Sequence, residues 1–209
     1  MIPLAWCPPT TLPPDPLTLM RCGRLAVLCA PMVAGARDRL ALLQQAFDAG
    51  LDLVPLAAGH VWPLAEACDS ALCAEDDLCT RLDRVAGQGQ ATLSLQWAEP
   101  RATLPSTGSG RDWLHRLRQQ HNAARARADR AAEVLATLTE AHPEPKGAVT
   151  TTPTGLRQSL LLPRGGLGDL HRKLRARALA DHGFSLCVTG LWPAFDFVCA
   201  PLHRAGAAA

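Results

Sequence analysis

The sequence predicts an α+β protein of two small domains, in which helices cover sheets. Strand-like and helix-like segments alternate along the chain, which is the pattern of layered folds. The 209 residues, 48% of them hydrophobic and 19% charged, suffice for a buried core and are ordinary for a globular protein. A glycine-rich stretch at 87–89 divides the alternation. We therefore expect a Pro-rich segment at 1–23, domains at 24–88 and 89–203, and a frayed tail at 204–209.

The first half of the chain alternates extended and helical segments. Prolines are frequent in 1–23, so we expect extended or loop-like backbone there rather than helix. Apolar runs at 24–30 and 51–56 predict strands. Between them, apolar residues recur at helical spacing over 37–50, which ends on a glycine, the residue type that commonly ends helices. A turn is expected at 57–60.

A second helix is predicted to begin at Pro63, because proline suits the first position of a helix. We expect it to break near the acidic patch of Glu75, Asp76 and Asp77. Its apolar positions are Leu64, Cys68, Leu72, Leu78, Leu82 and Val85.

The second half begins with a strand at 91–97, where Leu93, Leu95 and Trp97 alternate with other residues and share one face. The longest helix follows at 111–140. Its apolar stripe advances in steps of three or four residues. The stripe comprises Trp113, Leu117, His121, Ala124, Ala128, Ala131, Leu135 and Leu138.

Three further elements follow the sequence HPEPKG, which stops the long helix. We expect a strand at 156–163, a helix at 165–183 and a final core strand at 184–190.

The charge and hydropathy of the chain exclude several classes of partner. A net charge of +2 gives no global reason to expect nucleic acid or an anionic membrane. The longest apolar run, 25–36, is interrupted by Pro31 and is shorter than a membrane-spanning helix requires. The first residues lack the basic region of a signal peptide. We expect a cytosolic protein without a membrane segment.

The eight cysteines are expected to be reduced and mostly structural, because the chain is long enough to fold without disulfides and no CxxC occurs. Cys29, Cys187 and Cys199 lie in apolar strand-like runs, where a thiol behaves as a small hydrophobic group. The eight are Cys7, Cys22, Cys29, Cys68, Cys73, Cys79, Cys187 and Cys199.

A zinc site or a thiol-dependent active site can be drawn through His60, Cys68, Cys73 and Cys79. Their spacings match none of the usual zinc motifs, and the three cysteines do not share one helical face. No nucleophile elbow G-x-S-x-G occurs either, and the TGSG sequence at 107–110 suits a connector and helix cap. We expect no metal, cofactor or enzymatic activity, with a small thiol- or metal-dependent enzyme as the alternative.

A glycine-rich turn and an arginine-rich helix each give a weak indication of function. Gly165, Gly166 and Gly168 precede a helix but lack the spacing of nucleotide-binding loops, which favours a flexible connection. The long helix is rich in arginine, although acidic residues interrupt the basic stripe. Arg118 and Arg125 are therefore expected on a solvated face or on a docking face for a protein partner, with nucleic-acid binding by this helix as a third possibility. The arginines are Arg111, Arg116, Arg118, Arg125, Arg127 and Arg130.

Three aromatic residues, Trp192, Phe195 and Phe197, gather near the end of a chain that is only 4% aromatic. Gly190 permits a turn before them, and Pro193 favours extended backbone. The segment is expected to be a strand, with Phe195 and Phe197 on one face. The rings either lock the C-terminus onto the core or face a partner.

The segment TGLWPAFDFV resembles the C-terminal signature T-G-P-W-P-P-Y-S-F-V of the gas vesicle accessory family GvpF/GvpL. Weaker similarities follow in order from about Leu40 to Val198, such as LVPLAAGHVW beside the family's V-L-P-L-R-F-G-T-V-F. The family's aromatic-rich first strand is absent, and Ala57 and Ala58 replace an Arg and a Phe. The matching residues are Val54, Pro55, Leu56, Gly59, Val61, Thr189, Gly190, Trp192, Pro193, Phe197 and Val198.

This resemblance implies a non-enzymatic assembly factor for gas vesicles, built from two α+β domains of which the C-terminal one is a modified ferredoxin-like fold. The implied partners are the main shell protein, a small and very hydrophobic subunit, and other accessory proteins. The implied location is the cytoplasm and the gas vesicle. Candidate partner-binding residues are Trp192, Phe195, Phe197, Arg118 and Arg125. Candidate structural residues of the motifs are Pro55, Gly59, Gly190 and Pro193.

Overall fold

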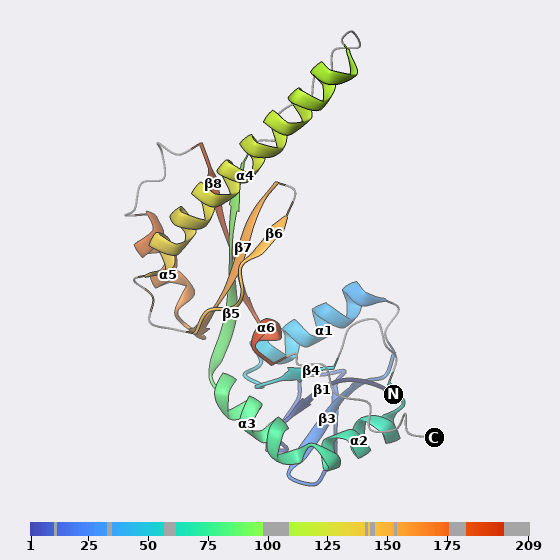
Figure 1. Ribbon diagram of the computed structural model, residues 1–209. Coiled ribbons are helices and arrows are strands. Elements are labelled where there is room, and N and C mark those ends of the chain that lie inside the picture. The colour runs from blue at the N-terminus through green and yellow to red at the C-terminus, as the bar shows by residue number, and fades with distance from the viewer. Residues whose placement is uncertain are drawn as a thin grey trace. The chain divides into compact units, whose positions relative to one another are not determined.

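In the computed structural model the chain folds into two compact units (Figure 1). The first unit comprises Met1–Gln90, Leu161–Gly165 and Gly190–Ala209, and the second comprises Ala91–Leu160 and Gly166–Thr189. The structure describes residues 1–10, 12–32, 35–56, 62–97, 109–140, 142, 145–152, 154–175 and 183–198. The units are not the consecutive domains expected at 24–88 and 89–203, because later segments of the chain return to the first unit.

The first unit contains an antiparallel sheet of four strands in the order β2-β3-β1-β4. Residues 1–23, expected to form a separate segment, supply two of these strands, and β1 lies between β3 and β4. Trp6 of β1 is paired with Val27 on one side and Val54 on the other. The strands are β1 (Ile2–Cys7), β2 (Thr18–Cys22), β3 (Leu25–Ala30) and β4 (Val54–Pro55).

The helices of the first unit largely confirm the sequence-based expectations. The helix expected over 37–50 is observed, and Gly50 beyond its end has the positive φ of +96° that favours glycine. The segment after Pro63 is broken at Ala74, beside the acidic patch. The turn expected at 57–60 lies outside the described residues. The helices are α1 (Ala36–Asp48), α2 (Leu64–Cys73), α3 (Glu75–Val85) and the single turn α6 (Phe195–Val198).

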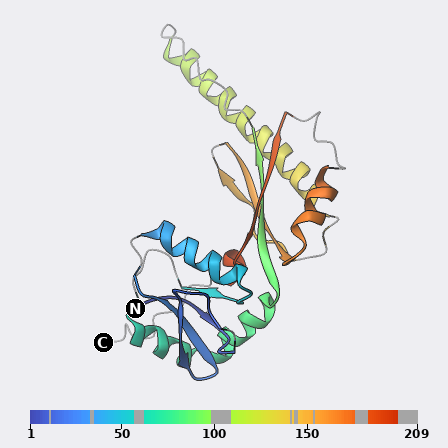
Figure 2. The same ribbon diagram turned by 180° about the vertical axis from the view of Figure 1, so that it is seen from behind.

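Two apolar cores lie on opposite faces of this sheet. Alternate residues of β3 enter different cores, Val27 joining α2 and α3 while Leu28 joins Leu43 and Phe47 of α1. Both views show α1 on one side of the sheet and α2 with α3 on the other (Figure 2). Burial on both faces explains why β3 is an uninterrupted apolar run. We refer to these as the α1-side core and the α2/α3-side core.

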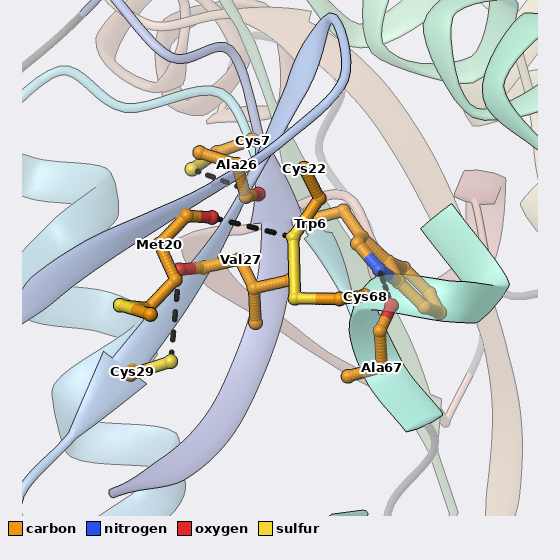
Figure 3. Close-up of a disulfide and its surroundings, with 9 residues drawn as sticks. All are labelled: Trp6, Cys7, Met20, Cys22, Ala26, Val27, Cys29, Ala67 and Cys68. Atoms are coloured by element: carbon orange, nitrogen blue, oxygen red, sulfur yellow. Dashed lines mark hydrogen bonds between the residues drawn. A yellow bond between two sulfur atoms is a disulfide. The ribbon is translucent and has the colours of Figure 1, made fainter. Parts of the chain in front are cut away.

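The cysteines differ from expectation in two respects. Cys22 and Cys68, 46 residues apart in sequence, form a disulfide between the end of β2 and α2, with their Cα atoms 5.5 Å apart (Figure 3). The expectation of reduced thiols is therefore wrong for this pair, since folding brings two distant segments together. Cys29 is buried as expected, whereas Cys187 is exposed. Cys199 lies outside the described residues.

Alkylation of the native protein is expected to label Cys73 and Cys187 quickly and to leave Cys7 and Cys29 unmodified. Cys73 and Cys187 are exposed, whereas burial raises the pKa of the Cys7 thiol to about 12 and raises that of Cys29. At pH 8 a thiol of pKa 12 is ionised to only about one part in 10⁴, and the thiolate is the reactive form. Peptide mass spectrometry after iodoacetamide treatment measures each rate. Equal labelling of all four thiols in the native protein would contradict the burial.

The second unit is built around another antiparallel sheet of four strands, in the order β6-β7-β5-β8. The chain order is strand, helix, two strands, helix, strand, and the first and third strands are central, which is the split βαβ arrangement of ferredoxin-like folds. The α+β class is thereby confirmed. The elements are β5 (Gln88–Gln96), α4 (Gly110–Glu140), β6 (Thr150–Thr152), β7 (Gly155–Pro163), α5 (Leu167–Arg175) and β8 (Ser185–Trp192).

Strand β8 is an edge strand rather than the buried core strand that was expected. Its burial alternates, with Leu186 and Val188 half-buried and Ser185, Cys187 and Thr189 exposed. An edge strand has one neighbouring strand, and only one of its faces is covered here, so half of its side chains remain in solvent. The helix expected at 165–183 is observed as α5, and residues 176–182 lie outside the described part of the chain.

Helix α4 is half packed and half exposed. Towards its C-terminal end Ala131, Leu135 and Leu138 are buried, whereas Trp113 and Leu117 of the same expected stripe are exposed. In both views the N-terminal part of the helix extends beyond the sheet of its own unit (Figures 1 and 2). Among the described residues, no helix is both long and apolar enough to cross a membrane.

Candidate partner-binding surfaces

The C-terminal motif forms a helical turn rather than the expected strand. Residues i and i+2 share a face in a strand, but in a helix they are about 200° apart. Phe195 therefore packs against the α1-side core, whereas Phe197 packs against the α2/α3-side core. Both rings are half-buried, and Ala194 and Val198 beside them are buried. The two rings thus help to fasten the motif to both cores of the first unit.

Hydrogen bonds fasten the same motif. The Gln90 side-chain amide donates to Asp196 Oδ2 at 2.8 Å, and the Asp196 backbone N–H donates to Gln90 Oε1 at 2.8 Å. Arg81 Nη1 donates to the Val198 carbonyl at 2.8 Å, and Gln44 Nε2 donates to the Leu191 carbonyl at 3.0 Å. These bonds link the motif to α1, α3 and the start of β5, so its backbone position is determined from several sides.

The motif residues expected to be structural occupy constrained positions. Gly190 has φ of +133°, a conformation that side-chain-bearing residues rarely adopt, and Pro193 is buried. Pro55 of β4 is buried and pairs with Ala5 of β1. Gly59 lies outside the described residues.

Trp192 is the most exposed ring of the motif, with 36% of its surface accessible. Since its neighbours Leu191 and Pro193 are held by hydrogen bonding or burial, the indole is presented from a fixed backbone. We call this exposed indole with its immediate neighbours the Trp192 surface. The first unit also has a pocket of about 360 Å³ beside Phe197. It is lined by Asp77, Thr80, Arg81, Arg84, Asp196, Phe197 and Val198.

The second candidate surface lies on α4, in the other unit. Arg118 and Arg125 are both exposed there, seven residues apart on the same helix. The apolar side chains Trp113, Leu114 and Leu117 of this helix are about half exposed as well. Arginine and apolar groups together are typical of protein-binding surfaces.

Arg164 is an organising residue that sequence analysis missed. Its Nη1 donates to the Phe47 carbonyl at 2.5 Å, and its Nη2 donates to the Leu51 carbonyl at 2.6 Å and to Asp52 Oδ1 at 2.9 Å. The guanidinium lies 4.3 Å from the centre of the Phe47 ring. Its backbone N–H donates to the Gly87 carbonyl, and Gly87 N–H donates to Asp52. The turn expected to be a flexible connection thus begins with a residue that binds the end of α1.

The residues considered for metal or thiol chemistry are not assembled in the described part of the chain. No cluster of three or more His, Cys, Asp or Glu side chains that could hold a metal occurs among the described residues. Cys68 is in the disulfide with Cys22, and Cys73 is exposed on α2. His60 lies outside the described residues.

Comparisons with known proteins agree with one another. Residues 11–199 match the family model described as gas vesicle synthesis protein GvpL/GvpF. The fold is similar to the crystal structure of GvpF from Anabaena sp. PCC7120, with a TM-score of 0.72 and 14% identity over 95% of this chain and 96% of that one. GvpF from Microcystis aeruginosa gives 0.71 and 14%, covering 95% and 99%. No curated protein matches this sequence.

Proposed function

Because the chain belongs to the GvpL/GvpF family of gas vesicle synthesis proteins, we propose that its gas vesicle role is that of an assembly factor without enzymatic turnover. It binds the main hydrophobic shell subunit, and other accessory proteins, before the subunit enters the vesicle wall. The observation that supports this most is the family match over nearly the whole chain. Binding then prevents aggregation of a subunit whose apolar surface would otherwise be exposed to water.

The Trp192 surface is the proposed contact with the shell subunit. A half-exposed indole on a fixed backbone can bury a large apolar area while losing little conformational entropy. The motif's other rings, Phe195 and Phe197, anchor the motif, because they pack against the two cores. Aromatic anchors of this kind contribute a large share of the affinity in protein interfaces.

Replacing Trp192 by alanine is expected to reduce capture of the shell subunit at least about tenfold, as losing one aromatic anchor costs roughly 2 kcal/mol or more. Purified full-length protein, immobilised at equal loading, is presented with freshly synthesised shell subunit, and the bound fraction is measured. Circular dichroism should show an unchanged fold, because the Trp192 ring is not part of either core.

Leu72→Ala is the matched control, since Leu72 is also a large exposed apolar residue, 55% accessible, but lies on α2. It should capture the subunit as the unaltered protein does. Undiminished capture by the Trp192 variant would remove the Trp192 surface from the proposal. Failure of the unaltered protein to capture the subunit would overturn the assembly role proposed above.

A further inference from the structure

The N-terminal part of α4 exposes large apolar side chains to solvent. Trp113 is 50% accessible, Leu114 59% and Leu117 48%. About 20 residues, roughly 30 Å of helix, precede the first buried position at Ala131. We call residues 110–130 the exposed half of α4.

Local interactions account for a helix in this position. Alanine and arginine, its commonest residues, have high helix propensity. Ser109 and Asp112 form a reciprocal cap: the Asp112 N–H donates to Ser109 Oγ at 3.3 Å, and the Ser109 N–H donates to Asp112 Oδ2 at 3.2 Å. Hydrogen bonds from Ser109 lower the pKa of Asp112, which keeps the capping carboxylate ionised. The exposed half is therefore already formed as a helix before any partner binds.

A seven-residue repeat runs along the whole helix, and its inner positions are apolar except for His121. Steps of three and four alternate without exception from Leu114 to Leu138, as at the inner positions of a coiled coil. The C-terminal part of this stripe is buried, but the N-terminal part, with the same periodicity, is exposed. We call the whole stripe the α4 seam. Its positions are Leu114, Leu117, His121, Ala124, Ala128, Ala131, Leu135 and Leu138.

The charges beside the seam are positive. Arg118 and Arg125 follow Leu117 and Ala124 directly, at positions that flank the inner residues of a coiled coil and contact its partner helix. Arg127 flanks the other side. The exposed half carries six arginines and two aspartates, a net charge of +4, whereas the whole chain has only +2.

We propose that the exposed half of α4 binds an acidic amphipathic helix of a partner protein, pairing along the α4 seam. The partner helix supplies apolar residues at heptad spacing and glutamates or aspartates that face Arg118 and Arg125. Its bulkier apolar side chains lie over the small residues Ala124 and Ala128. The inference deepens the proposed function and rests on it for the premise that this protein works by holding other proteins.

Charge complementarity selects this occupant over a second copy of the chain. A second copy has no acidic residue at the flanking positions of its exposed half, so it supplies no counter-charge to the arginines. Those positions are Arg111, Trp113, Arg118, Gln120, Arg125 and Arg127. A fully apolar partner would leave the arginine row without counter-charges. An acidic amphipathic helix covers the apolar seam and also supplies carboxylates that pair with the arginines.

The test uses two synthetic 28-residue peptides, each with leucine at the inner heptad positions. The flanking positions carry glutamate in one peptide and lysine in the other. Full-length protein is titrated into each labelled peptide, and binding is followed by fluorescence anisotropy. The glutamate peptide is expected to bind at least about tenfold more tightly than the lysine peptide, because flanking charges set partner choice.

Three double substitutions distinguish binding along the seam from a general effect of net charge. Leu114→Gln with Leu117→Gln keeps good helix formers and is expected to weaken glutamate-peptide binding at least about tenfold. Arg118→Glu with Arg125→Glu should reverse the preference towards the lysine peptide. Arg116→Glu with Arg130→Glu changes the net charge equally but lies away from the seam, so its binding should stay within about threefold of the unaltered protein. Circular dichroism confirms that helix content is unchanged.

The inference would be overturned by absence of peptide binding, by equal binding of both peptides, or by an equal loss in the Arg116/Arg130 control. Sedimentation equilibrium measures whether the protein forms a dimer. A dimer that the Leu114/Leu117 substitutions abolish would assign the seam to self-association instead. The peptides contain no gas vesicle component. Failure here therefore leaves shell-subunit capture untouched, and failure of that capture leaves peptide binding measurable.

Discussion

Replacing Trp6 by alanine is expected to destabilise the first unit by about 3–5 kcal/mol, a large fraction of the stability of a small domain. The side chain is only 1% exposed and lies in the α2/α3-side core. Its ring packs edge-on against Trp62, with ring centroids 6.2 Å apart. Its Nε1 donates to the Ala67 carbonyl at 3.1 Å, as Figure 3 shows. Alanine removes this hydrogen bond and leaves a cavity between the sheet and α2.

Urea denaturation followed by circular dichroism measures the effect, and the unfolding midpoint should fall by about 1–3 M. Trp113→Ala serves as the control, because that ring is half exposed on α4 and its loss should change stability by less than about 1 kcal/mol. A midpoint unchanged by Trp6→Ala would mean that β1 is not an integral strand. The N-terminal 23 residues would then be a separate segment, as the sequence alone indicates.

Replacing Arg164 by methionine is expected to destabilise the first unit by about 2–3 kcal/mol. Methionine retains much of the apolar stem, but it cannot donate to the Phe47 and Leu51 carbonyls or pair with Asp52. The Arg164 and Asp52 side chains are each about one quarter exposed, so the loss is smaller than for a fully buried ion pair. The unfolding midpoint again provides the measurement.

Arg172→Met is the matched control for this substitution. Arg172 pairs with Asp169 at 3.0 Å on the surface of α5, and its side chain is 81% exposed, so less than about 0.5 kcal/mol should be lost. If both variants lost the same small amount, the contacts of Arg164 would contribute no more than a surface ion pair. Hydrogen exchange of the amides of α1 would then remain unchanged as well, whereas loss of its C-terminal contacts should accelerate exchange there.

The residues proposed to contact partners differ from those that pack the cores, so the two roles can be tested separately. In the C-terminal motif, Phe195 and Phe197 pack against the cores, while Trp192 is the most exposed ring. In α4, Leu135 and Leu138 are buried, while Leu114 and Leu117 are exposed. Substitutions can therefore test each surface without unfolding the unit that carries it.

Much of the fold follows from local sequence patterns. The apolar run of β3, the alternation in β5 and the helical spacing of α1 and α4 each follow from the backbone period of a single strand or helix. Gly50 follows α1 with the positive φ that favours glycine, and the acidic residues after Ala74 suit the first turn of α3. The ordered motifs that resemble the GvpF/GvpL family agree with the family match. These features can be predicted from the sequence because the spacing of apolar residues depends on one helix or strand alone.

Other features were decided only by tertiary structure. Cys22 meets Cys68 across 46 residues, Gln90 binds Asp196 across 106 and Arg164 binds Phe47 across 117. The motif Phe195–Val198 is too short for its period to distinguish a helical turn from a strand, and packing on two cores selects the turn. The α4 seam is the clearest case. Its periodicity shows that one side of the helix is apolar, but only the folded unit determines where that side is covered, because covering requires contacts between distant segments.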